Sequence, residues 1–108
     1  MTRVTYRNDS ECFEIEFSGH ADFAPRGKDI VCAGISVLAS ELLLASRRAR
    51  QKGEITDLQS SAGEGLVRLH FRYAATPCAM REVVEVVLEC LQNIALEYGE
   101  NLMLEKSN

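Results

Sequence analysis

The sequence has 108 residues, of which 46% are hydrophobic and 26% are charged, and its formal net charge is −4. Domains typically span about 50 to 250 residues, so this length predicts a single domain, residues 1–108, with one core. Residues 1–8 are polar and lack the basic and apolar blocks of a secretory signal, so we expect a cytoplasmic protein.

The charge is unevenly distributed along the chain. Residues 1–52 carry eight Lys and Arg against seven Asp and Glu, whereas residues 53–108 carry four against nine. An acidic second half argues against nucleic acid as the main partner and favours a basic polypeptide. The most apolar stretch, residues 30–45, contains Ser36, Ser40 and Glu41 and is shorter than the ~20 residues of a membrane span. We therefore expect neither nucleic-acid nor membrane binding.

The four cysteines show no metal-binding pattern. Neither a CxxC motif nor a Cys/His ligand spacing is present, so the sequence predicts no zinc site, no other cofactor and no disulfide framework. The cysteines are Cys12, Cys32, Cys78 and Cys90.

The first segments predict a β-hairpin with one covered face. Residues 4–7 form a short strand pattern, and residues 8–10 a turn. Cys12–Ser18 alternates strictly, with Phe13, Ile15 and Phe17 on one face and Cys12, Glu14 and Glu16 on the other. We interpret Cys12 as an incidental residue of the polar face.

A long helix is predicted from residue 30 to about residue 52. Asp29 is a suitable N-cap, and Gly53 can end the helix. The apolar positions recur at steps of three and four, as an amphipathic helix requires; they are Val31, Ile35, Leu38, Leu42, Ala45 and Ala49, with Ile30, Val37 and Leu44 expected to widen the buried stripe. The basic cluster Arg47, Arg48, Arg50 and Lys52 suits the helix C-terminus, and an RNA-binding patch is the alternative interpretation.

The second half repeats the strand–strand–helix pattern and adds a final strand. Residues 55–61 are a weak strand, residues 62–65 a turn, and Leu66–Tyr73 a strong strand with Arg68, His70 and Arg72 on its outward face. Opposite charges would face one another if this strand neighbours the one that carries Glu14 and Glu16. Thr76 as N-cap and Pro77 at the first position predict a helix that reaches residue 98. Residues 102–105 form a last strand. The order ββα-ββ-αβ predicts an α+β two-layer sandwich, with two long helices packed on a small mixed sheet of about five strands.

Cys32 and His20 are the candidate catalytic residues. Cys32 lies at about the third position of the predicted helix, where the aligned peptide dipoles favour a thiolate. His20 lies across a loop that Gly19, Pro25 and Gly27 can fold back, so its imidazole can act as base and acid for the thiol. Burial of Cys32 as a small hydrophobic side chain is the structural alternative. Cys78 with His70 is a rival pair, because Cys78 also lies near a helix start.

The segment from Gly19 to Ser36 resembles the bacterial ribosomal-processing cysteine protease (Prp) family. The resemblance consists of Gly-His-Ala, a short loop, and Gly-x-Asp-Ile-Val-Cys-Ala-Gly followed by Ser36; the tail Glu97-Tyr98-Gly99-Glu100-Asn101 is also similar. It implies a cysteine endopeptidase that removes a short N-terminal extension from a large-subunit ribosomal protein, with His20 and Cys32 as the catalytic pair. It also implies a homodimer.

We predict supporting roles for five further residues: Gly19, Asp22, Asp29, Ala33 and Ser36. Asp22 or Asp29 would orient the imidazole, and backbone N–H groups near Cys32 would hold the oxyanion. Three alternatives remain open: a prophage-type protease that acts on phage structural proteins, a non-catalytic protein that binds a ribosomal or phage component, and a redox-sensing thiol.

Overall fold

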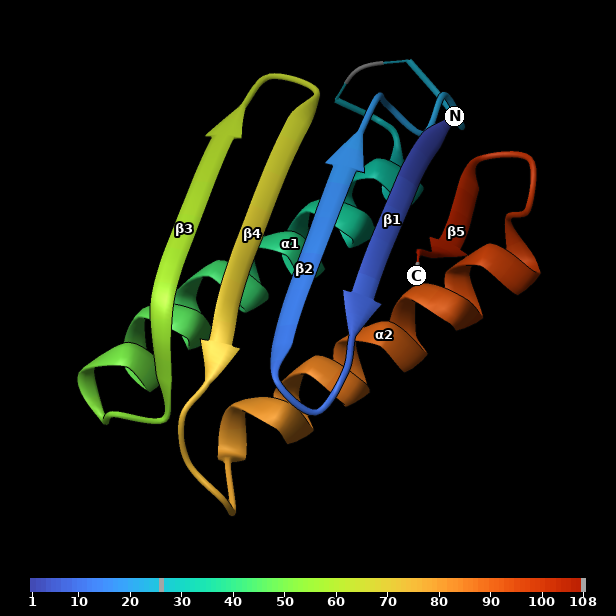
Figure 1. The fold of residues 1–108 in the computed structure, drawn as a ribbon. Helices are drawn as coiled ribbons and strands as arrows, with labels where there is room; N and C mark the ends of the chain where they lie inside the picture. The colour runs from blue at the N-terminus through green and yellow to red at the C-terminus, as the bar shows by residue number, and fades with distance from the viewer. Residues whose placement is uncertain (26, 108) are drawn as a thin grey trace.

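A computed structural model describes residues 1–25 and 27–107 of the chain. Two helices cover one face of a five-stranded sheet, and the other face is open (Figure 1). The strand order is β3-β4-β2-β1-β5, and every neighbouring pair is antiparallel except β1 and β5. The elements are β1 (Thr2–Asn8), β2 (Cys12–Ser18), α1 (Ile30–Gln51), β3 (Ile55–Gly63), β4 (Leu66–Tyr73), α2 (Ala79–Glu97) and β5 (Leu102–Lys106). The predicted fold class and element order are confirmed.

The core lies between the sheet and the helices. In β2 the alternation places Phe13, Ile15 and Phe17 towards the helices. Phe13 lies opposite Phe71 of β4, with their ring centroids 5.4 Å apart. Each fully buried Phe contributes on the order of 1.5–3 kcal/mol through the area it removes from water. These two strands therefore fix the centre of the sheet.

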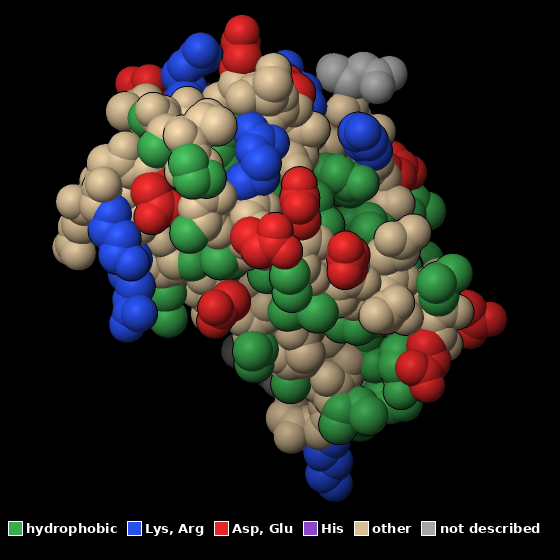
Figure 2. Space-filling view, turned by 90° about the horizontal axis from the view of Figure 1, so that it is seen from below, with side chains coloured by type: hydrophobic (Ala, Val, Ile, Leu, Met, Phe, Trp, Pro, Cys, Tyr) green, Lys and Arg blue, Asp and Glu red, His purple; other side chains and the backbone are tan. Residues whose placement is uncertain are grey.

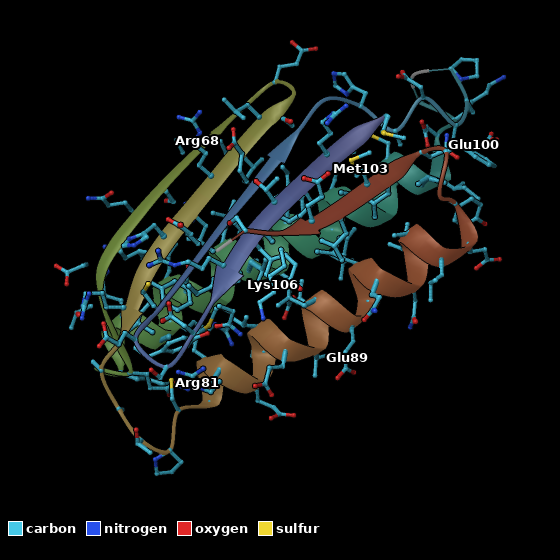
Figure 3. The ribbon with its side chains drawn as sticks, turned by 45° about the vertical axis from the view of Figure 1, so that its right-hand side comes forward. Arg68, Arg81, Glu89, Glu100, Met103 and Lys106 are labelled. Carbon is cyan, nitrogen blue, oxygen red and sulfur yellow. The ribbon has the colours of Figure 1, made fainter. Side chains whose placement is uncertain are left out.

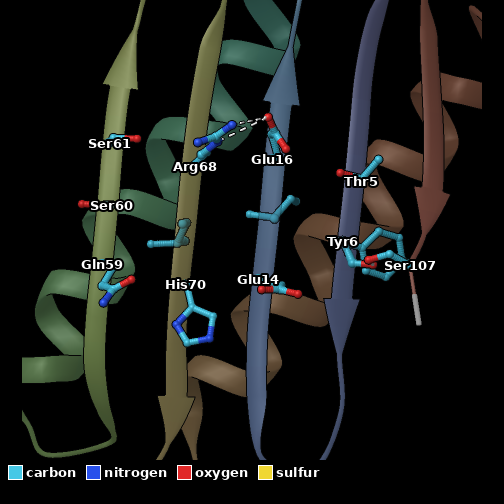
Figure 4. Close-up of a pocket in the computed structure, with 12 residues that line it drawn as sticks. Thr5, Tyr6, Glu14, Glu16, Gln59, Ser60, Ser61, Arg68, His70 and Ser107 are labelled. Atoms are coloured by element: carbon cyan, nitrogen blue, oxygen red, sulfur yellow. Dashed lines mark hydrogen bonds and ion pairs between the residues drawn. The ribbon is translucent and has the colours of Figure 1, made fainter.

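The open face of the sheet is lined by polar and charged side chains. β2 and β4 are neighbours, and the register pairs Glu16 with Arg68, the opposite charges expected, and Glu14 with His70. Arg68 donates to Glu16 at 3.3 Å, above a shallow groove on this face (Figure 4). An exposed pair of this kind contributes only about 0–1 kcal/mol, so it fixes register more than stability.

Cys12 differs from the prediction. Only 4% of the residue is exposed, because the side chain of Arg7 lies against it, with Nη2 2.8 Å from the sulfur. The interpretation of Cys12 as an incidental polar-face residue is therefore wrong. A neighbouring strand, not the alternation within β2, decides its burial.

α1 differs from the prediction on one face. Val31, Ile35, Leu42 and Ala49 are buried as expected. The three residues expected to widen the stripe are instead exposed: Ile30 (65%), Val37 (66%) and Leu44 (58%). α1 has 22 residues, and by length and composition it is long and apolar enough to cross a membrane. A core helix passes the same test, and α1 contributes a full row of side chains to the core of this domain.

α2 begins two residues later than predicted, and β3 is longer. Cys78, not Thr76, is the N-cap, and within the described chain its side chain makes no capping bond. Glu54, just before β3, accepts from the N–H of Met80 at 3.0 Å instead. The Thr-Pro pattern failed because the acceptor comes from a distant segment. β3 continues to Gly63, which shortens the expected turn to two residues.

Candidate active site

The structure places His20 and Cys32 on one groove of about 870 Å³. His20 follows the end of β2 and is exposed; Cys32 is the third residue of α1 and is half-buried. Phe23 and Ala24, in the segment after His20, donate their N–H groups to Asp29, the residue before α1. The pair can therefore meet the same bound peptide.

The backbone on either side of His20 is held in place. Gly19 adopts a φ of +82°, and a Cβ there would lie 2.7 Å from the carbonyl oxygen of Met1, so glycine is required at this position. Its N–H donates to the carbonyl of Gly65 in the β3–β4 turn at 2.8 Å. Ala21, on the other side of His20, is completely buried.

Asp29 is the N-cap of α1, as predicted. Its Oδ1 accepts from the N–H of Cys32 at 2.8 Å, and its Oδ2 accepts from the N–H groups of Phe23 at 2.9 Å and Ala24 at 3.4 Å. Burial raises the pKa of Asp29, but these N–H bonds outweigh it and hold the pKa below its usual value. The carboxylate therefore connects the loop to the helix that carries Cys32.

Asp22 and Asp29 both bind backbone or terminal N–H groups. Oδ2 of Asp22 accepts from the Met1 amino group at 2.8 Å, and the oxygens of Asp29 accept backbone N–H groups. In the part of the chain that the structure describes, neither forms a hydrogen bond with His20. The structure does not support the prediction that one of them orients the imidazole.

The backbone N–H groups expected to hold an oxyanion are engaged in this conformation. The N–H of Cys32 donates to the Asp29 side chain, and that of Ala33 to the Asp29 carbonyl at 3.0 Å. The carboxylate of Asp29 thus competes with a bound oxyanion for the Cys32 N–H, as its predicted role as N-cap implies.

The remaining predicted residues line the groove. Gly19, Asp22, Ala33 and Ser36 all contribute to it. The opposite wall is the end of the β3–β4 hairpin, residues 62–67, where the sequence predicted a turn and the start of a strand but no part of the site. The small residues Ala62, Gly63 and Gly65 were the available signal, since a turn lined by small side chains allows a peptide to approach closely.

The rival pair is not brought together. His70 lies on the open face of the sheet (Figure 4), whereas Cys78 packs against the core at the start of α2 and points to Glu54, with its sulfur 3.7 Å from the carbonyl oxygen. Among residues 1–25 and 27–107, no group of three or more His, Cys, Asp or Glu side chains is placed to hold a metal ion.

A family model described as "Cysteine protease Prp" matches residues 1–103. The chain belongs to the Prp family. It is 31% identical, over 104 residues, to the ribosomal processing cysteine protease Prp of Staphylococcus aureus strain Mu50, covering 94% of this chain and 92% of that relative. This Prp family member is therefore a cysteine protease.

Solved structures support the same assignment. The S. aureus Prp in complex with a covalently linked product peptide superposes with a TM-score of 0.73 at 26% identity, over 99% of this chain and 100% of that one. The same enzyme with a substrate peptide gives a TM-score of 0.64 at 28% identity, over 99% and 100%. A Streptococcus mutans protein, SMU.848, shares the fold with a TM-score of 0.69 at 22% identity, over 98% and 93%.

Proposed function

We propose that this Prp family member removes a short N-terminal extension from a large-subunit ribosomal protein, with Cys32 as nucleophile and His20 as general base. The observation that carries the proposal is that His20 and Cys32, twelve positions apart in sequence, line one groove of about 870 Å³. The similar S. aureus protein is named a ribosomal processing protease, and one of its structures contains a covalently linked product peptide.

The proposed reaction is acyl transfer through a thioester. The Cys32 sulfur attacks the scissile carbonyl carbon while His20 takes up the thiol proton, and the tetrahedral intermediate expels the amine of the mature protein, to which His20 returns that proton. Water, deprotonated by His20, then attacks the thioester carbonyl and releases the extension with a new carboxylate. Cys32 recovers its proton from His20, and the cycle closes without a cofactor.

The field at the start of α1 contains two opposing contributions. The aligned peptide dipoles of this 22-residue helix attract negative charge to its start. The Asp29 carboxylate repels further negative charge there, because it is an anion bound to the N–H of Cys32. A substrate that displaces this carboxylate would have two effects. It would free the Cys32 N–H to bind the oxyanion, and it would remove the repulsion between the carboxylate and negative charge on the sulfur.

We further propose that the protein works in the cytoplasm as a homodimer, on a polypeptide and not on nucleic acid. Cytoplasmic location would give it access to ribosomal precursors and keep Cys32 reduced. The acidic second half of the chain suits a basic ribosomal substrate.

The test is cleavage of candidate precursors from the same genome, read by mass spectrometry. Large-subunit ribosomal proteins and phage structural proteins are compared, so that the prophage-type alternative is tested in the same assay. Cys32→Ala and His20→Ala should each abolish cleavage, and the double variant should be hardly worse than either, because residues that act as a unit are non-additive. Cys32→Ser should also fail but should still bind the precursor.

Cys90→Ala is the matched control, since Cys90 is on α2 and half-buried like Cys32. It should retain most activity. Cleavage of a verified precursor by Cys32→Ala at near the wild-type rate would show that the nucleophile is elsewhere.

A further inference from the structure

We propose that the turn between α2 and β5 positions His20 for catalysis, through Asn101 and Tyr98. Asn101 Nδ2 donates to the carbonyl of Ala21 at 2.9 Å. The ring of Tyr98 meets the ring of Phe23 edge-on, with centroids 5.4 Å apart and an interplanar angle of 86°. The inference rests on the proposed function, because it assigns His20 a catalytic role.

The α2–β5 turn holds the backbone on one side of His20, and the β3–β4 turn holds it on the other side. The Gly19 N–H donates to Gly65 in the β3–β4 turn, and the Ala21 carbonyl accepts from Asn101. The residue between these two anchors is exposed and faces the groove. These two bonds restrain the backbone of His20, and its imidazole lies beside Gly65, where a Cβ would be 3.6 Å from Nε2.

Asn101 is itself held by hydrogen bonds, so its bond to the Ala21 carbonyl can restrain the backbone beside His20. Its N–H donates to the Tyr98 carbonyl at 2.8 Å, and its carbonyl accepts from the N–H of Thr2 at 2.9 Å. Its backbone is therefore connected to the end of α2 and to the start of β1. The turn that contains Glu100 lies beside the segment that follows β2 (Figure 3).

The Phe23–Tyr98 contact extends the same restraint further into the loop. Asp22 adopts a φ of +57°, so the chain turns sharply after Ala21. Phe23 then packs on Tyr98 with its side chain, while its N–H donates to Asp29. An edge-to-face pair contributes about 0.5–1.5 kcal/mol beyond the area it buries. The loop is thus bound to α2 through Phe23 and to α1 through Asp29.

The isosteric variant Asn101→Asp tests the hydrogen bond, because it keeps the shape of the side chain and removes the donor. A misplacement of about 1 Å can reduce a rate by about 100-fold, so we expect kcat to fall about 10- to 100-fold in Asn101→Asp and Asn101→Ala, with a smaller change in KM. Tyr98→Ala should also lower kcat, whereas Tyr98→Phe keeps the ring and should restore it. Glu100→Gln, in the same turn, is the control and should match wild type.

A substrate-free readout separates positioning from stability. The rate at which iodoacetamide labels Cys32 is measured against pH in wild type, His20→Ala and Asn101→Asp. We expect the Asn101→Asp profile to move towards that of His20→Ala, because a displaced imidazole no longer assists the thiol. The peptide for the kcat measurement is a synthetic one that spans an N-terminal extension cleaved by wild type.

Two results would overturn the inference. If Asn101→Asp keeps wild-type kcat and labelling, or loses activity only in proportion to its unfolded fraction by circular dichroism, Asn101 has no positioning role. If His20→Ala remains fully active, the proposed function and this inference both fail. The first result leaves the proposed function intact, so the two failures are distinguishable.

Discussion

Asp29 carries more of the site than its role as a helix cap requires. A cap needs one oxygen on one N–H group, and the Asp29 Oδ1 bond to Cys32 meets that need. The second oxygen binds the N–H groups of Phe23 and Ala24. A single carboxylate therefore determines how the loop after His20 lies over the helix that carries Cys32.

The variant Asp29→Asn tests this role through pH. The folded protein lowers the pKa of Asp29 from its reference value of 3.8, so the ionised form stabilises the fold above that value, and this contribution is lost as pH falls through the lower folded pKa. In Asn the amide oxygen can still accept from Cys32, but the NH₂ group cannot accept from Phe23. We expect Asn to lower the urea midpoint at pH 7 and to differ less from wild type below about pH 4.

The measurement is a series of urea unfolding curves for both proteins between pH 7 and pH 3. Asp22→Asn is the matched control, because Asp22 lies in the same loop and its carboxylate binds the chain terminus. A difference between wild type and Asp29→Asn that stays constant across the series would show that ionisation of Asp29 does not contribute.

At the scale of elements, α2 depends on a cap that lies outside it. The side chain of Glu54 accepts from the N–H of Met80, and Cys78 contacts the same residue. Arg81 adds a second connection: it donates to the carbonyls of Asp9 and Ser10, and its guanidinium lies 3.8 Å above the ring of Tyr73. Glu54 and Arg81 thus attach the start of α2 to two connections at the same end of the sheet, α1–β3 and β1–β2.

Glu54→Ala should lower the free energy of unfolding by about 1 kcal/mol, the usual cost of losing an N-cap acceptor. Glu54→Gln keeps an acceptor oxygen and should lose less than half of that. Glu85→Ala, on the exposed face of α2, controls for the change in charge. Chemical denaturation measures all three, and equal losses in the Ala and Gln variants would rule out the capping role.

Features that depend on a local pattern could be predicted from the sequence, whereas features that depend on contacts between distant segments could not. The alternation in β2 and β4 correctly predicted the covered face and the outward face on which Glu16 and Arg68 meet, because strand patterns depend on neighbouring residues. The start of α2 was wrong because its cap is supplied by Glu54, which no local pattern specifies. The groove followed the same rule: the positions of Gly19, His20 and Cys32 were anticipated, whereas the β3–β4 wall and Asn101 depend on how distant segments meet.

At the scale of the whole molecule, α1 leaves apolar side chains uncovered. Ile30, Val37 and Leu44 recur every seven residues, close to two helical turns, so they lie along one line of the helix. Each is more than half exposed. Figure 2 shows hydrophobic side chains that reach the surface between acidic ones on the side seen from below. The exposed positions on α2 are more acidic than those on α1. One of them, Glu89, points away from the sheet (Figure 3).

The proposed homodimer would bury this line against a second copy. A symmetric interface uses the same residues twice, so each substitution acts at two places. Val37→Asp puts a carboxylate at the centre of the line, where burial without a partner is unfavourable, and we expect the dimer dissociation constant to rise by about 100-fold or more.

Val86→Asp is the matched control, because Val86 is a 47% exposed valine on α2. Sedimentation velocity at micromolar concentration should show a dimer for wild type and Val86→Asp and a 12.0 kDa species for Val37→Asp. A wild-type protein that sediments only as the monomer would exclude the homodimer, and dissociation by Val86→Asp but not by Val37→Asp would move the interface from α1 to α2.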